Sequence, residues 1–339
     1  MSEGLSERRL IERIRRGISH SPRVPVGIGD DAAVLTLAPG QFLLATTDLL
    51  MEEVDFRRRS ASPYDIGWKA MAVNLSDIAA MGGTPRYALA AVALPEKFSV
   101  EEVDGLYDGM KALAGLHGVE LVGGDTSASP DGMVITLTLL GEAARPILRS
   151  GAQPGDLLMV TGSLGLSAAG LALLEKSPQG VSSGDEEIAL NAHRRPTPRI
   201  REGQWLSRDG TVHAMIDLSD GLATDLRHIA DESKVSAVVK IDRLPIPPAV
   251  SRIAKASRRD PLALAVTGGE DFELLISVPP VREAEFLRRF ADETGTALTV
   301  IGEVTAGPPK VEFLDGSGNP VELGEGYDHF ANRPLRERR

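Results

Sequence analysis

Aspartates recur in short motifs along the whole chain, next to glycine, serine or threonine. The motifs are GIGDD, TTD, NLSD, GGDT and DLSDG, and a further acidic pair occurs in GGED. A single aspartate of this kind predicts no more than a turn or a helix cap. Five or six such motifs instead suggest loops that converge. Two like charges about 4 Å apart cost about 4 kcal/mol at an effective dielectric of 20, so converging carboxylates need a cation among them.

The composition limits which cation this could be. The chain has no cysteine, and its six histidines lack the spacing of a metal site, which leaves few ligands for a soft or borderline metal. Carboxylate and hydroxyl oxygens are instead the ligands of Mg²⁺, which proteins often bind together with phosphates. The aspartate motifs therefore indicate a site that handles phosphates through Mg²⁺.

Other nucleotide-binding motifs are weak or missing. The segment GIGDDA at 27–32 matches the dinucleotide fingerprint G-x-G-x-x-A. The sequence AVLTLAPG that follows predicts a strand and a turn where the fingerprint needs a helix, and two carboxylates would face the pyrophosphate. The chain also lacks the P-loop GxxxxGK[ST] and the HRD and DFG motifs of protein kinases. These nucleotide-binding classes are therefore disfavoured.

The elements that must position the aspartates alternate between strands and helices, and most of the acidic motifs fall at element ends. We expect strands at 42–47, 88–94, 119–122, 133–140, 157–161, 212–216, 235–241, 272–278 and 297–304. We expect helices at 5–18, 62–81, 99–117, 163–175, 220–232 and 281–293, two more beside 196–198, and a loop at 176–187. The pattern restarts near 145–150. This predicts an α/β protein with domains at 1–147 and 148–332 and a charged tail at 333–339.

Length and charge agree with a two-domain enzyme. At roughly 150 residues per domain, 339 residues suggest two domains. The 37 basic and 48 acidic residues give a net charge of −11, which opposes broad binding to nucleic acids or anionic membranes. The start MSEGLSERRL is no signal peptide, and the longest apolar run, 88–94, is far shorter than the ~20 residues of a membrane span. We therefore expect a cytoplasmic protein.

Taken in order, the motifs resemble those of thiamine-monophosphate kinase, a family of the PurM-like ATP-binding superfamily. The resemblance runs from about 27 to 330 and rests on GIGDDAAVL, TTDLLMEEVDF, KAMAVNLSDIAAMGGTP, LVGGDTS, RSGAQPGDLLMVTG, HRRPTPR, IDLSDGL, TGGEDFELL and GYDHF. NLSD, GGDT and GGED are shared across the superfamily. The combination of TTD, DLSDGL and GYDHF is more specific to this family.

The resemblance implies a reaction and a fold. The reaction is the transfer of a phosphoryl group from ATP to thiamine monophosphate, which gives thiamine diphosphate and ADP. The fold is a two-domain PurM-like α/β (α+β) structure, with a β-rich N-terminal domain, a C-terminal α/β domain and ATP in the cleft. It also implies a homodimer formed through the N-terminal domains.

The resemblance further implies roles for individual residues. Several Mg²⁺ ions would be held by Asp31, Thr46, Thr47, Asp48, Asp77, Asp125, Asp217 and Asp220. ATP would contact Gly124, Asp125, Arg149 and Ser219. The substrate would meet Asp55, Glu270 and Tyr327, although Asp55 stands where many family members carry histidine.

The chemistry of the two substrates agrees with the aspartate motifs. Both are polyanions, so an enzyme that joins them must first cancel their repulsion, and phosphoryl transfer leaves the protein mainly positioning and charge stabilisation to supply. The attacking atom is an oxygen of the substrate's own phosphate, whose second pKa is about 6, so neither a covalent nucleophile nor a strong general base is expected. The planar guanidinium of Arg149 suits a phosphate of ATP.

Two alternatives stay open. Selenophosphate synthetase and the hydrogenase-maturation member of the superfamily depend on cysteine or selenocysteine, which disfavours both for a chain without cysteine. An enzyme like aminoimidazole ribonucleotide synthetase remains possible. From another class, a non-catalytic acidic cation-binding protein would bind metal without turning over ATP.

Overall fold

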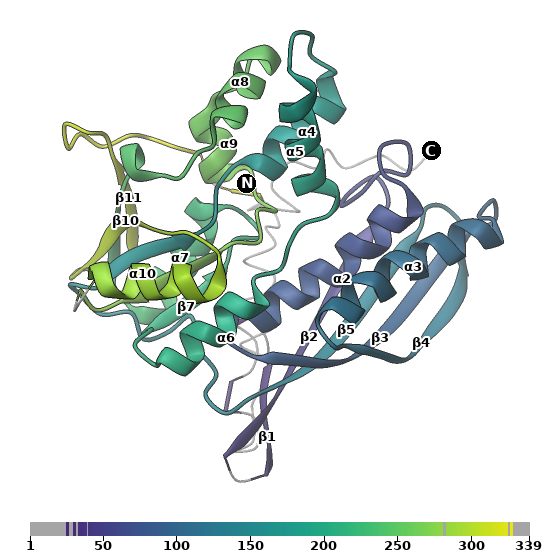
Figure 1. The fold of residues 1–339 in the computed structure, drawn as a ribbon, viewed down its shortest axis with the longest axis horizontal. Coiled ribbons are helices and arrows are strands. Elements are labelled where there is room, and N and C mark those ends of the chain that lie inside the picture. Colours follow the sequence, from purple (N-terminus) through teal and green to yellow (C-terminus); the bar gives the residue numbers. More distant parts are fainter. Residues whose placement is uncertain are drawn as a thin grey trace, which may run out of the picture.

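The chain folds around two β-sheets, each with its own helices (Figure 1). The computed structural model describes residues 25–26, 30–31, 33–38, 40–280, 283–324 and 326–327. The helix expected at 5–18 and the tail at 333–339 lie outside these residues. None of the described helices is long and apolar enough to cross a membrane. The fold is therefore α/β in content, as predicted, with helices and strands in both halves.

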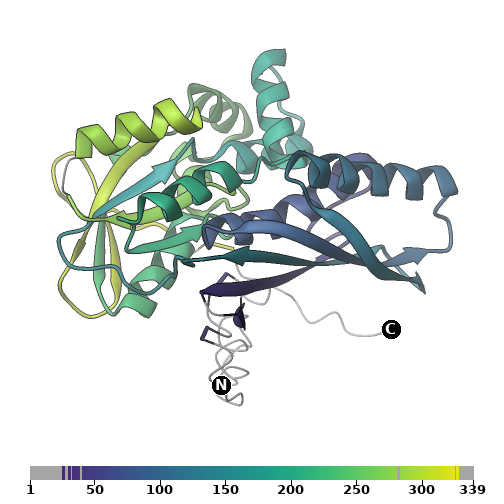
Figure 2. The ribbon, with the colours of Figure 1, turned by 60° about the horizontal axis from the view of Figure 1, so that its bottom comes forward.

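The first sheet has five strands in the order β1-β2-β5-β3-β4. They are β1 (Ala33–Ala38), β2 (Gln41–Met51), β3 (Thr84–Pro95), β4 (Glu120–Ser129) and β5 (Val134–Ala143). All described pairs are antiparallel except β3 with β4. Helices α2 (Pro63–Ala80) and α3 (Val100–Leu116) cover one face (Figure 2). On the other face, which we call the open face, the described strands carry exposed side chains such as Leu49 and Leu89.

Local sequence signals fix where α2 and α3 begin. Both helices start with a capping box, in which a serine side chain and an acidic side chain three residues later accept each other's backbone N–H. In α3 the pair is Ser99 and Glu102, with N···O distances of 3.2 and 2.7 Å. In α2 the pair is Ser62 and Asp65. Both predicted helix starts are confirmed.

Glycines let α2 and α3 pack with their backbones unusually close. A Cβ on Gly67 of α2 would lie 1.9 Å from the carbonyl oxygen of Leu106, and a Cβ on Gly109 of α3 would lie 2.0 Å from that of Tyr64. Real Cβ atoms do not come so near to oxygen. Side chains at these two positions would therefore push the helices apart.

The second sheet has six strands in the order β11-β8-β10-β6-β9-β7. They are β6 (Leu157–Thr161), β7 (Ala214–Asp217), β8 (Ser236–Lys240), β9 (Leu274–Val278), β10 (Leu298–Thr305) and β11 (Lys310–Leu314). The helices of this half are α4 (Leu166–Lys176), α5 (Ser183–Arg194), α6 (Ile200–Asp209), α7 (Leu222–Ser233), α8 (Pro248–Ser257), α9 (Pro261–Thr267) and α10 (Glu283–Thr294). A single described pair, β11 with β8, is parallel.

Three expectations about the elements were wrong or incomplete. Helix α5 begins inside the predicted loop 176–187, because Ser182 caps it through the N–H of Asp185 and it packs against α4. Helices α8 and α9 and strand β11 were not expected. Strand β4 extends to Ser129, well past the predicted end at 122, because the glycine-rich segment GGDTSAS also pairs with β3.

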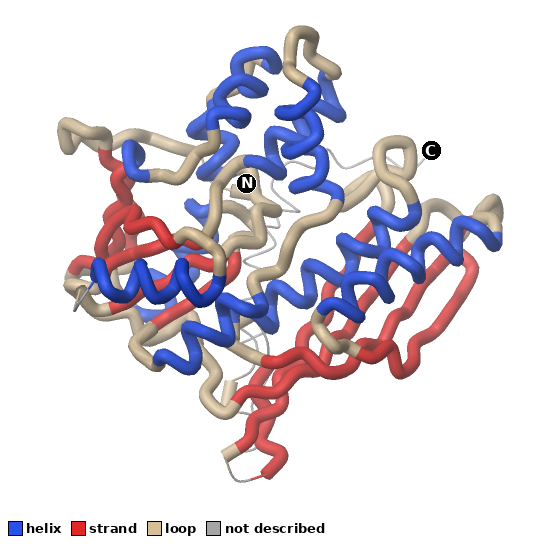
Figure 3. Tube along the Cα trace, viewed as in Figure 1, coloured by secondary structure: helices blue, strands red, loops and turns tan. Residues whose placement is uncertain are grey.

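Helix α2 lies between the two halves of the chain and joins them (Figure 3). One hydrophobic core contains residues of α2, of the first sheet and of α6 and β9 in the second half. A Cβ on Gly203 of α6 would lie 2.1 Å from the carbonyl oxygen of Ala79, so this contact is also close. The indole Nε1 of Trp68 donates to the carbonyl of Pro196 at 3.0 Å. The side chains of α2 therefore reach both halves.

The close contact of α2 with α3 predicts opposite effects for two glycine-to-alanine changes in one helix. Gly109→Ala should lower the free energy of unfolding by about 1–3 kcal/mol, because the new Cβ has no room. Gly105→Ala should raise it by about 0.5–1 kcal/mol, because its Cβ would lie 3.4 Å from the Cβ of Pro63, an ordinary contact, and alanine favours the helix. Urea unfolding measures both. Equal effects would contradict the packing.

Candidate active site

Three aspartates from distant parts of the chain meet where the two halves join. Asp31 precedes β1, Asp77 lies in the last turn of α2, and Asp217 ends β7. Each offers a carboxylate oxygen, and these oxygens all lie within 4.8 Å of one another. We call these three residues the acidic centre. The convergence expected from the aspartate motifs is therefore present for this set.

Consecutive hydroxyl and carboxylate groups on α2 tie the acidic centre to both halves. Ser76 donates its hydroxyl to Asp217 Oδ2 at 2.6 Å. Asp77, the next residue, accepts the hydroxyl of Thr46 in β2. Ser76 therefore faces the second half of the chain and Asp77 faces the first sheet. Both aspartates are held by a neutral donor, which does not cancel their charge.

Arg149 supplies the described positive charge closest to this centre. Its Nε and Nη2 donate to the two oxygens of Asp31 at 3.1 and 2.5 Å, and its backbone N donates to Asp30 Oδ2 at 3.1 Å. The segment that carries it lies between β5 and β6 and contains no strand or helix. Its side chain is 18% exposed, so the pair with Asp31 is largely shielded from water. Arg149 therefore meets the predicted need for a cation only in part.

Burial and mutual repulsion make Asp30, Asp48, Asp77 and Asp217 weak acids. Burial raises the pKa of Asp77 and of Asp217 well above the ordinary value, and neighbouring aspartates raise it further. Burial, followed by the charge of Asp31, raises the pKa of Asp30 to about 7. Burial, followed by the charges of Asp55 and Asp31, raises the pKa of Asp48 to about 6. Ionisation of all these carboxylates would therefore create more negative charge than the described cations balance.

Asp48 in β2 lies beside this centre with an unsatisfied oxygen. Its Oδ2 is buried and has no hydrogen-bond partner in the part of the chain that the structure describes. A buried carboxylate oxygen without a donor costs free energy. Such an atom is well suited to a bound cation.

Two residues expected at the metal site lie on the opposite face of the first sheet. Across the sheet, Asp48 is in register with buried Leu137, whereas Asp125 lies in the next row, with exposed Leu49. Thr47 also points to the exposed face, where its hydroxyl donates to the carbonyl of Leu137 at 3.0 Å. Within one chain, the structure therefore does not bring Thr47 and Asp125 into the acidic centre.

Asp220 belongs to a second acidic group next to the first. Asp220, Asp225 and His228 offer ligand atoms within 4.8 Å of one another. Asp225 accepts the backbone N–H of Asp220 and of Gly221 at 3.2 and 3.0 Å, so it also caps the start of α7. Burial and then the charges of Asp220 and Asp217 raise the pKa of Asp225 well above its ordinary value. The two acidic groups are therefore electrostatically connected.

The residues expected to contact ATP lie in two different places. Gly124 is in β4, where a Cβ would lie 1.8 Å from the carbonyl oxygen of Ala90, so only glycine fits between these strands. Ser219 follows β7, two residues after Asp217, and its carbonyl accepts the N–H of Glu270 at 2.7 Å. Ser219 is therefore near the acidic centre and also near the residues expected to bind substrate.

Glu270 is held by two side chains from other elements. Lys69 Nζ of α2 lies 2.6 Å from its Oε1, and His193 Nδ1 of α5 lies 3.1 Å from its Oε2. Burial alone would raise the pKa of Glu270, but the charge of Lys69 and the hydrogen bond from His193 lower it to about 2. Burial also lowers the pKa of His193. Glu270 is therefore ionised near neutral pH.

The remaining residues of the expected substrate site lie around Glu270. The backbone N of Tyr327 donates to the carbonyl of Asp220 at 3.1 Å, and the ring is half exposed. Since Ser219 binds Glu270, the loop at 219–220 holds both residues. Asp55 accepts the N–H of Met51 at 2.7 Å and lines a small pocket together with Lys69 and His193.

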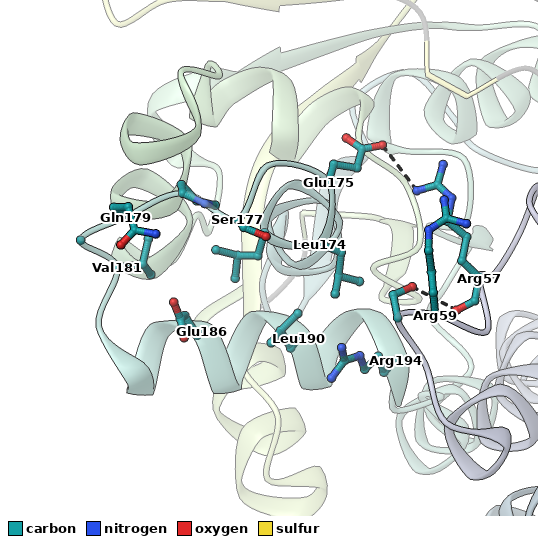
Figure 4. A pocket seen from close by; sticks show the side chains of 14 residues that line it. Arg57, Arg59, Leu174, Glu175, Ser177, Gln179, Val181, Glu186, Leu190 and Arg194 are labelled. Carbon is teal, nitrogen blue, oxygen red and sulfur yellow. Dashed lines mark hydrogen bonds and ion pairs between the residues drawn. The ribbon is translucent and has the colours of Figure 1, made fainter.

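A larger pocket of about 740 Å³ adjoins this small one (Figure 4). The two pockets share Arg57, Ser60, Leu174 and Arg194. The larger pocket lies beside α4 and α5, and none of its lining residues belongs to the acidic centre. The acidic centre is therefore identified by its clustered carboxylates and not by the size of a pocket.

Several residues of the site were not anticipated. Asp30 and Ser76 lie next to expected residues in GIGDD and NLSD, so their motifs were the available signal. Lys69 precedes Ser76 by seven residues, about two helical turns, which places both on one side of α2. His193 is one of the six histidines without metal-site spacing, and no spacing in the sequence linked it to Glu270.

Family models and known proteins match nearly the whole chain. The model for the N-terminal domain of AIR synthase related protein matches residues 29–143, and the model for its C-terminal domain matches 153–314. The chain is 39% identical over 326 residues to thiamine-monophosphate kinase of Bacillus subtilis, covering 95% of this chain and 98% of the relative. It is 40% identical over 326 residues to that of Salmonella typhimurium, covering 95% and 96%.

Solved structures agree with these matches. The structure described as AaThiL complexed with AMPPCP and TMP superposes with a TM-score of 0.84 at 35% identity and covers 96% of this chain and 97% of its own. Thiamine-monophosphate kinase from Stenotrophomonas maltophilia superposes with a TM-score of 0.74 at 36% identity, covering 91% and 97%. The fold is also that of hydrogenase maturation protein HypE, with a TM-score of 0.69 at 23% identity.

The raised pKa of Asp48 predicts that removing its charge stabilises the metal-free protein. Folding disfavours the ionised form, so the cost is complete at pH 7 and fades as the pH falls through about 6 towards 4. Asp48→Asn should therefore raise the free energy of unfolding by about 1–3 kcal/mol at pH 7 in EDTA, and by much less at pH 4.5.

Asp65→Asn is the matched control with the opposite sign. Burial opposes the ionised form of Asp65, but hydrogen bonds from Ser62 and Arg195 outweigh it and lower the pKa. This stabilisation is present at pH 7 and is lost as the pH falls, so the variant should lose about 1 kcal/mol at pH 7. Urea unfolding at both pH values measures the pair. Destabilisation by Asp48→Asn at pH 7 would contradict the charge excess.

Proposed function

The chain belongs to the thiamine-monophosphate kinase family of the AIR synthase-related proteins, and from its acidic centre we propose how it carries out that family's reaction. It transfers a phosphoryl group from ATP to thiamine monophosphate, which gives thiamine diphosphate and ADP. The observation that carries the mechanism is the meeting of Asp31, Asp77 and Asp217 between the two halves, with their oxygens within 4.8 Å. The consumption of ATP also fits the predicted cytoplasmic location.

The donors at the acidic centre fit Mg²⁺. They are carboxylate oxygens of Asp31, Asp77 and Asp217, with Asp48 contributing the buried oxygen that has no partner among the described residues. An all-oxygen donor set suits Mg²⁺ rather than a softer metal. We propose that these residues, with Thr46 and with Asp220 from the neighbouring group, hold Mg²⁺. Bound there, Mg²⁺ would neutralise phosphate oxygens and orient the two substrates.

Arg149 is proposed to meet the phosphates of ATP from the inter-domain segment. Its two bonds to Asp31 use two of the five guanidinium N–H donors, so other donors remain for a phosphate. The predicted domain boundary between residues 147 and 148 stays a proposal, and it would place Arg149 directly after the first domain. Gly124 and Ser219 are proposed as further ATP contacts.

The attacking oxygen needs no base from the chain. It belongs to the phosphate of thiamine monophosphate, which is already largely ionised at neutral pH. The chain therefore contributes alignment and charge compensation, and we assign no side chain as nucleophile or general base.

Glu270, Tyr327 and Asp55 are proposed to bind the organic end of thiamine monophosphate. The thiazolium ring is cationic, and an aromatic face such as that of Tyr327 attracts a cation. The ionised carboxylate of Glu270 can accept hydrogen bonds from the aminopyrimidine. Glu270 and Asp55 both border the same group of side chains, Lys69 and His193, which supports one shared subsite.

We further propose a homodimer formed through the open face of the first sheet. Large apolar side chains are exposed there: Leu49 (57%), Met51 (40%), Tyr87 (46%), Leu89 (39%) and Val122 (54%). A contiguous apolar face of this kind marks a protein interface. Thr47 and Asp125 lie on the same face, so in a dimer they would meet the partner, which leaves their proposed metal role to the assembled enzyme.

An ADP-release assay with and without thiamine monophosphate tests the function. ADP should appear only when ATP, Mg²⁺ and thiamine monophosphate are all present, and ³¹P NMR should detect thiamine diphosphate. EDTA should abolish the signal. Mg²⁺ binding without ADP release would instead support a non-catalytic cation-binding protein. ADP release that ignores thiamine monophosphate would point to another AIR synthase-related activity.

Arg149→Lys should weaken the use of ATP selectively. A lysine ammonium cannot form the bidentate pair with Asp31 while also donating to a phosphate in a fixed plane. The KM for ATP should rise about tenfold, with little change in the KM for thiamine monophosphate. Arg145→Lys, an exposed arginine in the same segment, is the control and should behave as the wild type. An equal rise of both KM values would show that Arg149 is structural.

Leu89→Glu should dissociate the proposed dimer. A charge in the middle of the apolar face would be buried without a partner when the sheets pair. Analytical ultracentrifugation should find a dimer for the wild type and a monomer for the variant. Leu116→Glu, at a residue 70% exposed on α3 away from that face, should remain dimeric. A monomeric wild type, or a dimeric Leu89→Glu, would contradict this interface.

A further inference from the structure

We infer that Lys69 and His193 are positioning residues that fix the carboxylate of Glu270 towards thiamine monophosphate, an inference that rests on the function proposed above. Lys69 Nζ lies 2.6 Å from Glu270 Oε1, and His193 Nδ1 lies 3.1 Å from Glu270 Oε2. Each carboxylate oxygen therefore has its own donor. The donors come from α2 and α5, two elements that are far apart in the sequence.

The burial of these groups differs in a way that suits a positioned carboxylate. The side chain of Lys69 is 5% exposed, whereas that of Glu270 is 31% exposed. An ammonium this deeply buried needs an ionic partner, and the described residues give it Glu270. Lys69 therefore lies behind Glu270, and the open side of the carboxylate is the side that a ligand can reach.

The backbone of Glu270 adds to the need for outside support. Glu270 has a φ of +57°, a left-handed conformation that non-glycine residues seldom adopt, and its N–H is held by the carbonyl of Ser219 at 2.7 Å. The side chain extends back to Lys69 of α2 and His193 of α5. The pair with Lys69 then fixes its end.

His193 orients the second oxygen through one protonation pattern. A carboxylate can only accept, so the short contact selects the tautomer with hydrogen on Nδ1. The same Nδ1 lies 3.1 Å from the hydroxyl oxygen of Ser167 at the start of α4, so its hydrogen is shared between Glu270 and Ser167, and both acceptors fix the ring. Both Lys69 and His193 line the small pocket with Asp55. The arrangement thus faces the proposed substrate subsite.

Lys69 is too far along α2 to belong to the acidic centre. It precedes Asp77 by eight residues, which is about 12 Å along a helix. It shares the side of α2 that carries Ser76, the residue that holds Asp217. One rigid helix therefore sets the phosphate end and the organic end of the site at a fixed separation. Lys69 acts on the organic end, through Glu270.

Steady-state kinetics of Lys69→Met tests this role. The KM for thiamine monophosphate should rise about tenfold, because one charged hydrogen bond to Glu270 is lost, while the KM for ATP changes less than about twofold. Lys69→Arg should recover much of the loss. Lys176→Met is the matched control: this exposed lysine of α4 donates to the carbonyl of Ser257 and should leave both KM values unchanged.

A double-mutant cycle shows whether Lys69 acts through Glu270. In a Glu270→Gln background, Lys69→Met should change the KM for thiamine monophosphate less than about twofold, because the two residues form one unit. His193→Leu offers a second route if Lys69→Met folds poorly, and it should also raise this KM selectively. Thermal unfolding and binding of a non-hydrolysable ATP analogue with Mg²⁺ verify the fold of each variant.

The outcomes separate this inference from the proposed function. A folded wild type that releases no ADP with thiamine monophosphate would contradict the function itself. Two results with an active wild type would overturn the positioning role alone. One is an equal rise of both KM values in Lys69→Met, and the other is an effect of Lys69→Met that adds fully to that of Glu270→Gln.

Discussion

The repulsion between buried carboxylates is the constraint on which the site depends. Asp31, Asp77 and Asp217 lie within 4.8 Å at the junction of the two halves, and Arg149 neutralises Asp31 without balancing the others. Thr46 and Ser76 satisfy hydrogen bonds but carry no charge. Burial, and then this deficit, raise the pKa of Asp77 and of Asp217. Because the two packed halves hold these carboxylates together, the site favours the binding of cations. Two polyanionic substrates require such cations to offset their repulsion.

Helix α2 is the element that makes this arrangement possible. Its Gly67 and Gly109 of α3 allow the two helices to approach closely, and a close contact with Gly203 of α6 holds α2 against the second half. Successive residues Ser76 and Asp77 then serve opposite neighbours, and Lys69 reaches a third segment two turns earlier. A helix that is packed on both sides is rigid and keeps its side chains at fixed positions. The distance between the acidic centre and Glu270 is therefore set by helix geometry and not by loops.

The sequence contains the aspartate motifs, but it predicts only part of their geometry in the fold. Capping boxes are local, so the starts of α2 and α3 were predictable from four residues each. Successive side chains of a strand point to opposite faces of the sheet, so the motif TTD places Thr46 and Asp48 on one face of β2 and Thr47 on the other. The face of Asp125 depends on how β4 pairs with β3, and the partners of Glu270 depend on tertiary packing of α5. Neither leaves a local pattern in the sequence.

The two ends of the site follow opposite electrostatic rules. Asp77 and Asp217 of the acidic centre have raised pKa values, whereas Glu270 has its pKa lowered to about 2 by Lys69 and His193. Because burial keeps His193 neutral near pH 7, the Lys69–Glu270 pair has no net charge. This neutral pair adds little attraction for the charge of a thiazolium ring. Recognition there must then depend on hydrogen-bond direction and on the aromatic face of Tyr327, which requires the carboxylate of Glu270 to be held in one orientation.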